Sequence, residues 1–240
     1  MSEIRRRLMA QNWENTPIYF EDMATKAECV AKFGGENGIT NPEFGTVGVR
    51  GIAGEITHRQ AKAVTYFGTP YNDGTSDLAL NTIGRFNELR YFDSLVGSHV
   101  GFCFKNTKVT EITLPKSVRI LSWRFSQGTS LARLELNEGL EQIMQEALTS
   151  NFTMKNLVIP STLKGMARLN YCNGIENLIL LPTEPPEFID DGYGNSFSFH
   201  EALKIYVPDE SVYAYKAAFA WNEYASCIYP MSSFADNKQK

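Results

Sequence analysis

The sequence predicts an α/β solenoid, in which short parallel strands stack one coil upon the next. Two observations predict it. A short apolar phrase recurs at a nearly constant interval, and each copy is followed by a turn and a further apolar residue. The 240-residue chain is 43% hydrophobic, which is enough to supply a continuous core. Its net charge of -4 and charged fraction of 21% give no basic footprint for nucleic acid.

Four copies of the phrase begin 22, 23 and 21 residues apart: ITLP at 112–115, LELN at 134–137, LVIP at 157–160 and LILL at 178–181. A further match at Leu89 and a late one, IYVP at 205–208, extend the series in both directions. A period of roughly 20 to 29 residues with apolar residues at i and i+2 is that of leucine-rich repeats. Each unit supplies a short strand and buries its apolar face only against its neighbours.

The rest of each repeat should return the chain to the start of the next strand. One set of apolar residues follows the turns: Val118, Leu140 and Leu163. A second set would fill the return arc: Phe125, Ala147 and Met166. Because the core is shared between coils, we expect Leu136→Asp or Ile159→Asp to collapse the stack.

Two helices are expected before the repeats. The first begins at Glu21 and ends at the glycines of 34–35. Its apolar residues recur at helical spacing: Met23, Ala27, Val30 and Phe33. The second begins at Thr57, where Gln60 completes a capping box, and continues through Val64. Between the two helices, seven glycines within 34–54 favour a loop or an irregular hairpin.

After the fourth phrase, a proline-rich stretch at 182–186 and a longer loop to His200 interrupt the period. The chain then returns as a strand at 205–208 and a short helix with side chains available for packing: Tyr213, Tyr215, Ala218 and Trp221. We interpret this helix as a cap, because the last coil of a solenoid would otherwise expose its apolar face. The chain therefore divides into an N-terminal arm (1–20), a helical and glycine-rich lead-in (21–85), the repeats (86–208) and a C-terminal cap with a polar tail (209–240).

The closing run IYVPDESVYAYK at 205–216, with Trp221 and the IYP of 228–230, resembles the end of BspA-like leucine-rich repeat proteins of gut and oral bacteria and their phages. The strand phrases that end in Pro115 and Pro160, and the prolines of 185–186, match as well. The resemblance covers roughly residues 86–232. It implies a non-enzymatic protein-binding or adhesion module that is displayed on a surface.

The segment ahead of the repeats is similar to a lead-in of this class, in which a helix carrying Cys-Val precedes a calcium-type loop. Cys29 and Val30 occupy the first place, and Gly54 would take position 6 of the loop. The ligand positions 1, 3, 5 and 12 would then fall on Val49, Gly51, Ala53 and Gln60. An EF-hand-like site needs a set of carboxylate or other side-chain oxygens at those positions. We therefore expect no metal there.

The opening of the chain has no apolar run after its charged residues, so we expect no secretory signal. The sequence contains no stretch of roughly 18 apolar residues that would cross a membrane.

A phage origin reconciles surface display with the expected lack of a secretory signal, since virion proteins leave the cell by lysis. The run EIRRRLM at 3–9 is similar to the starts of some tail-associated proteins of gut phages. We expect a structural virion protein that is cytoplasmic before release and acts within an assembly. The alternative is a bacterial surface adhesin that binds a host protein or glycan.

Residue types that carry catalysis or bind metals are not grouped in the sequence. The three histidines, His58, His99 and His200, lie in different segments, and Lys204 stands where an HExxH zinc motif from His200 needs its second histidine. The cysteines form no CxxC pair and are expected to be buried thiols: Cys29, Cys103, Cys172 and Cys227. The carboxylates of 184–191 share one polar loop and are expected to stay solvated. We therefore expect no enzyme activity and no cofactor.

Two groups of residues are candidates for contact with a partner. Tyr193 and Phe197, in a loop of small residues, and Trp123, in the repeats, are candidates for ligand binding. Packing against the end of the solenoid is the other interpretation of Phe197. In the arm, Arg5, Arg6, Arg7 and Leu8 are candidates for docking on a partner. Ile4, Leu8 and Met9 would lie on one helical face beside the arginines. The alternative is that the arm is a solvated tail.

Overall fold

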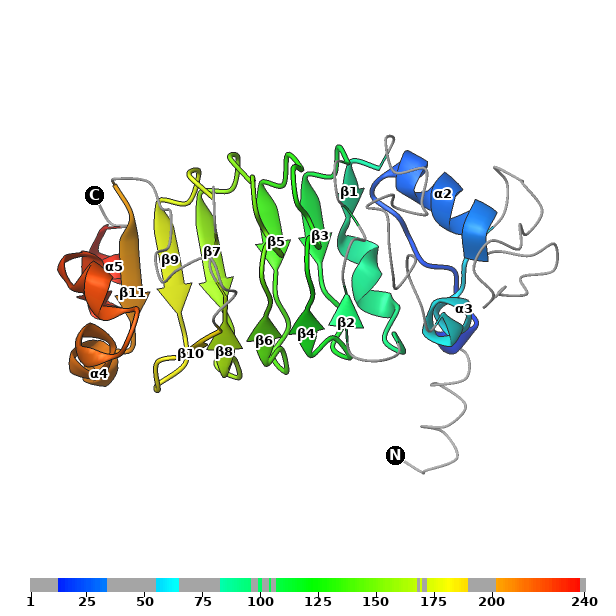
Figure 1. The fold of residues 1–240 in the computed structure, drawn as a ribbon. Coiled ribbons are helices and arrows are strands. Elements are labelled where there is room, and N and C mark those ends of the chain that lie inside the picture. The colour runs from blue at the N-terminus through cyan, green and yellow to red at the C-terminus, as the bar shows by residue number, and fades with distance from the viewer. Residues whose placement is uncertain are drawn as a thin grey trace, which may run out of the picture.

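The computed structural model describes residues 13–33, 55–64, 83–95, 99–100, 104, 107–167, 169, 172–189 and 202–237. Over the repeats, the chain winds into a stack of coils with short strands along two sides (Figure 1). The strand pairs are parallel, and they form three separate sheets. The predicted α/β solenoid is confirmed.

Strands of successive coils form two rows. The front row holds β1 (Arg85–Phe86), β3 (Glu111–Thr113), β5 (Arg133–Glu135), β7 (Asn156–Ile159), β9 (Asn177–Leu180), β11 (Lys204–Val207) and β12 (Ile228–Pro230). The back row holds β2 (His99–Val100), β4 (Ile120–Leu121), β6 (Gln142–Ile143), β8 (Gly165–Met166) and β10 (Glu187–Phe188). The back row is one sheet in the order β10-β8-β6-β4-β2, whereas the front row is divided into β1-β3-β5 and β12-β11-β9-β7.

The register of the front row follows the phrases found in the sequence. Ile112 pairs with Leu134, and Leu178 pairs with both Leu157 and Ile205. These residues are buried and form a continuous apolar column through the stack. Only the first expected match is wrong.

The partner of Ile112 in the first coil is Phe86, and Leu89 lies outside the strand. Leu89 belongs to a 3₁₀ helix, η1 (Asn87–Tyr91), that follows β1 directly. The spacing was misleading because Phe86, Leu89 and Phe92 are all buried, so apolar character alone does not mark the strand.

The residues expected on the return path are all buried. Met166, however, pairs with Ile143 in the back row, and Ile143 pairs with Leu121. It therefore lies earlier in its coil than Phe125, which packs at the bend against the ring of Phe104 at 5.4 Å. Met166 is therefore buried on the return path, as expected, although at an earlier point of its coil than Phe125 and Ala147.

A buried amide closes the bend after the back row. Asn151 donates through its side-chain nitrogen to the carbonyls of Ser126 (2.9 Å) and Leu148 (2.7 Å) and accepts from Thr129 Oγ1 (2.7 Å). These bonds join consecutive coils and satisfy carbonyls that water does not reach. The apolar pattern of the repeats gives no sign of the role of Asn151.

Both expected lead-in helices are confirmed. The first is α2 (Met23–Phe33), which ends immediately before Gly34. The second is α3 (His58–Ala63), where Thr57 and Gln60 make both bonds of the capping box. The glycine-rich stretch between these helices and three of the four residues expected at calcium-ligand positions, Val49, Gly51 and Ala53, lie outside the described residues.

The Asp22 carboxylate fastens the lead-in to the first coil. Its Oδ1 accepts from the backbone N–H groups of Ala24 and Thr25, and its Oδ2 accepts from those of Gly84 and Arg85. Burial acts to raise the pKa of Asp22, but these four hydrogen bonds outweigh it and hold the pKa below the ordinary value. One side chain therefore joins the start of α2 to the start of β1.

The C-terminal cap holds α4 (Val212–Ala217), α5 (Ser232–Asn237) and two 3₁₀ turns, η3 (Asp209–Ser211) and η4 (Asn222–Cys227). Tyr215 and Trp221 are buried and donate to the carbonyls of Pro182 (2.9 Å) and Pro186 (2.9 Å). The cap thus holds the proline-rich stretch in place. Tyr213 does not pack as expected, because it lies on the exposed side of α4.

Cys29 and Cys172 are buried, as the sequence predicted, whereas Cys227 is half-buried. Burial raises the pKa of the Cys172 thiol to about 12 and that of Cys29 well above its ordinary value. Both thiols are therefore protonated and unreactive at neutral pH. Cys103 lies outside the described residues.

The two aspartate substitutions should differ in severity, because Ile159 is fully buried and Leu136 only partly. We expect Ile159→Asp to cost more than about 4 kcal/mol of unfolding free energy, since it buries an unpaired charge in the shared core. We expect Leu136→Asp to cost about 1–2 kcal/mol, because its carboxylate can reach water. Urea unfolding followed by circular dichroism measures both, and equal losses would contradict the assigned register.

Candidate interaction face

The cap covers one end of the front row and leaves its middle open. Tyr206 of β11 is buried because Tyr229 and Phe234 lie against it, with ring centroids 6.1 and 4.7 Å away. By contrast, Val158 of β7 is 44% exposed and Leu181, after β9, is 37% exposed. Apolar surface is therefore open to solvent around β7.

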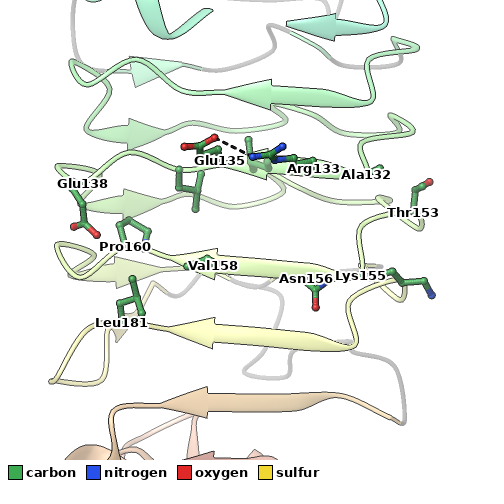
Figure 2. Close-up of a pocket in the computed structure, with 12 residues that line it drawn as sticks. Ala132, Arg133, Glu135, Glu138, Thr153, Lys155, Asn156, Val158, Pro160 and Leu181 are labelled. Atoms are coloured by element: carbon green, nitrogen blue, oxygen red, sulfur yellow. Dashed lines mark ion pairs between the residues drawn. The ribbon is translucent and has the colours of Figure 1, made fainter. Parts of the chain in front are cut away.

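Two hollows lie side by side on this open surface. The first, of about 650 Å³, lies between β5 and β7 (Figure 2). The second, of about 580 Å³, lies between β3, β5 and the lead-in. Both are lined by Glu135, Leu136 and Glu138, so they form one trough, which we call the front groove. Its apolar lining includes Leu134, Leu136, Val158, Pro160 and Leu181.

The first hollow lies where the front row is divided. At the starts of β3, β5, β9 and β11, a backbone bond joins each coil to the one before it: Thr110 N–H to Gly84 O (2.7 Å), Ala132 N–H to Thr110 O (2.8 Å), Glu176 N–H to Lys155 O (2.9 Å) and Lys204 N–H to Glu176 O (2.8 Å). Among the described residues, no such bond links Ala132 O to Lys155 or Asn156. We call this interruption the sheet break.

The back row stays paired across the same two coils. Lys164 and Gly165 both donate to Glu141 O, at 2.8 and 3.1 Å, and β6 pairs with β8. The sheet break therefore opens only the front of the stack. β5 and β7 are therefore the edge strands of two separate sheets in the same row, and the hollow lies between these two strands.

Charged side chains mark the two ends of the hollow (Figure 2). Arg133 and Lys155 lie near the starts of β5 and β7, and Glu138 lies at the opposite end. Arg133 pairs with Glu135 at 3.6 Å, and Lys155 pairs with Glu176 at 2.7 Å. These pairs are solvent-exposed, so each is worth about 0–1 kcal/mol and exchanges readily with a new partner.

An aromatic stack forms the other end of the front groove. The imidazole of His58 stacks on Trp13 with centroids 4.0 Å apart and meets the edge of Tyr91 at 4.6 Å. The guanidinium of Arg90 lies 5.1 Å from the centroid of the Tyr91 ring. Trp13, Arg90 and Tyr91 all line the groove. Burial, and then the charge of Lys62, lowers the pKa of His58.

Of the residues that the sequence suggested for binding, only Trp123 is described. It lies at the bend after β4, 42% exposed, with its Nε1–H donated to Glu146 at 2.9 Å and the Arg124 guanidinium 4.0 Å from its ring centroid. It is not among the residues that line the front groove. The other candidates lie outside the described residues: Arg5, Arg6, Arg7, Leu8, Tyr193 and Phe197.

One sequence signal for the groove is an apolar residue at an outward position of the phrase. The residue between the two core positions of each phrase faces outward, and it is Thr113 and Glu135 in the first two copies. In the later copies it is apolar: Val158, Ile179 and Tyr206. Ile179 and Tyr206 are buried, whereas Val158 is 44% exposed, and an exposed apolar residue of this kind indicates a contact surface.

The described residues contain no cluster of three or more histidine, cysteine or acidic side chains suited to a metal ion. None of the helices in that part of the chain has the length and apolar character needed to span a bilayer.

A family model for the BspA type leucine-rich repeat region matches residues 98–226, in six copies. The chain belongs to this family. No curated protein matches it. BspA-type repeats are typically interaction or adhesion modules and not enzymes, which suits a chain whose stack leaves one face open.

The aromatic stack gives a prediction for pH. Because His58 has a lowered pKa, we expect its imidazole to titrate below 6.5 in an NMR titration, and Lys62→Met to raise the pKa part of the way back. As the pH falls below about 6.5, the unfolded chain takes up a proton that the folded chain resists, so stability falls. A His58 pKa at or above 6.5 would contradict the stacked, desolvated geometry.

Proposed function

We propose that this BspA-type chain is a non-enzymatic protein-binding module that engages its partner through the front groove. The observation that carries the proposal is the exposed apolar surface at Val158 and Leu181, which line the hollow between β5 and β7. Exposed apolar patches bordered by charged residues are typical of protein interaction sites. Binding over an extended face also suits a rigid stack of repeats.

We further propose that the partner belongs to an assembly, as expected of a structural or tail-associated virion protein of a gut phage. The support is the likeness of 3–9 to the starts of some tail-associated proteins, with 1–20 as the docking segment. In this proposal the chain is cytoplasmic before release and then part of the virion. The alternative is a bacterial adhesin on the extracellular surface that binds a host protein or glycan.

Site-specific photocrosslinking tests the binding face. A benzoylphenylalanine at Val158 should capture a defined protein from the source culture, because Val158 lies in the front groove. The matched control is the same probe at Gln142, which lies in the back row on β6. Equal capture from both positions, or capture from Gln142 alone, would contradict the proposed face.

Mass spectrometry of purified phage particles and of cell-surface fractions separates the two settings. Recovery of the chain in intact particles at a fixed copy number is the expected outcome. Recovery on cells alone would overturn the virion proposal in favour of the adhesin.

A further inference from the structure

The hollow at the lead-in end of the front groove has an exposed aromatic ring in its lining. Trp13 lines this hollow of about 580 Å³ and is 48% exposed. His58 stacks on one face of the indole, so the other face is the one open to a ligand. An exposed indole face suits stacking against a second flat group.

The position of this ring is fixed before any ligand binds. The turn after Trp13 is closed by hydrogen bonds from the N–H and Oγ1 of Thr16 to the Trp13 carbonyl, at 3.0 and 2.6 Å. The N–H of His58 donates to the Thr16 carbonyl at 3.1 Å, which joins the turn to the start of α3. Because the ring is already ordered, little conformational entropy is lost when a ligand stacks on it.

The same hollow is lined by charged side chains of both signs in equal number: Lys62, Arg90, Lys116, Asp93, Glu135 and Glu138. Lys62 is paired with Glu14 at 3.3 Å. Among the described residues, Arg90 and Lys116 form no ion pair. These two exposed cations therefore keep hydrogen-bond donors for a ligand.

Two of the carboxylates keep acceptors for a ligand. Oδ1 of Asp93 accepts from the N–H of Ser117 at 2.7 Å, and Oε2 of Glu135 accepts from Oγ1 of Thr113 at 3.3 Å. The second oxygen of each carboxylate has no hydrogen bond within the described part of the chain. The hollow thus offers donors and acceptors together, with balanced charge.

We propose that this hollow binds a neutral sugar, a hexopyranose of a glycan, with one face of the sugar ring stacked on Trp13. The C–H groups on the face of a pyranose carry a slight positive charge and meet the negative face of the aromatic ring. The hydroxyl groups at the rim of the sugar both donate and accept, so they match cations and carboxylates at once. The inference goes beyond the proposed function, because it adds a ligand of another class at one end of the front groove.

Other classes of ligand fit the hollow less well. An anion would meet three carboxylates, and a cation would meet three cationic side chains. An apolar peptide side chain on Trp13 would displace water from Arg90 and Lys116 without replacing its hydrogen bonds, which costs free energy. The volume also lies within the range of roughly 300–1,000 Å³ that is usual for small-molecule sites.

Saturation-transfer NMR with the full chain tests the site. The probes are methyl β-galactopyranoside, methyl β-glucopyranoside and methyl α-mannopyranoside, and the control is mannitol, which has hydroxyl groups but no ring. We expect at least one sugar to bind with a dissociation constant below about 10 mM, with saturation strongest at the C–H protons of one ring face. Mannitol should bind at least about tenfold more weakly, because it offers no face to the indole.

The chain offers a matched pair of tryptophans. Trp123 is 42% exposed and has the Arg124 guanidinium over its ring, but it is not among the residues that line the front groove. We expect Trp13→Ala to weaken sugar binding at least about tenfold and Trp123→Ala to leave it unchanged. Circular dichroism verifies that both variants are folded.

A second pair of variants keeps Trp13 and changes only exposed lysines. Lys116 lines the hollow, whereas Lys108 precedes β3 and is not part of the lining. We expect Lys116→Ala to weaken sugar binding at least about fivefold and Lys108→Ala to leave it unchanged.

Four outcomes would overturn the proposal: none of the sugars binds, mannitol binds as tightly as the sugars, the two tryptophan variants weaken binding alike, or the two lysine variants do so. If the sugars fail while crosslinking from Val158 still captures its partner, the sugar site is wrong and the proposed function stands. If a sugar binds as expected while the crosslinking fails, the sugar site stands and the proposed protein contact is wrong.

Discussion

The structure depends on apolar burial that is shared between coils. No coil can bury Leu134, Leu157 or Leu178 alone, because each of these side chains is covered by the coils before and after it. Two consequences follow. The ends of the stack must be covered. The lead-in covers one end and is held there by hydrogen bonds to Asp22. The cap covers the other end and is held there by hydrogen bonds from Tyr215 and Trp221. Exposed outward positions of the front row, such as Glu135 and Val158, are by contrast free to vary without cost to the core.

The sheet break is compatible with a stable stack because the two rows of strands are separate. Bonds from Lys164 and Gly165 to Glu141 hold the same two coils together at the back, and the Asn151 amide joins them to the preceding coil at the bend. The front can therefore lose one set of strand bonds without dividing the core. The interval from Leu134 to Leu157 is the longest of the three between phrases, so the break coincides with an extra residue.

Much of the fold follows from the sequence, because a period, a capping box and a cap are local patterns. Thr57 and Gln60 specify the start of α3 through two bonds that their own spacing allows. The first strand was misplaced at Leu89 because burial does not distinguish a strand from a 3₁₀ turn. The sequence predicts only part of the front groove. The outward position is apolar in Val158, Ile179 and Tyr206, but that Val158 alone of the three stays exposed depends on where the cap lies. The missing bonds between β5 and β7 depend on how two coils pack and have no sequence signature.

Hydrogen exchange at single-residue resolution tests the central claim, that the front row is interrupted between β5 and β7. We expect the amides of Lys155 and Asn156 to exchange at least about tenfold faster than those of Glu176 and Asn177, which occupy the same places one coil later and donate to Lys155 O at 2.9 and 3.0 Å. Equal protection of the two pairs would mean that the front row is continuous and would contradict the sheet break.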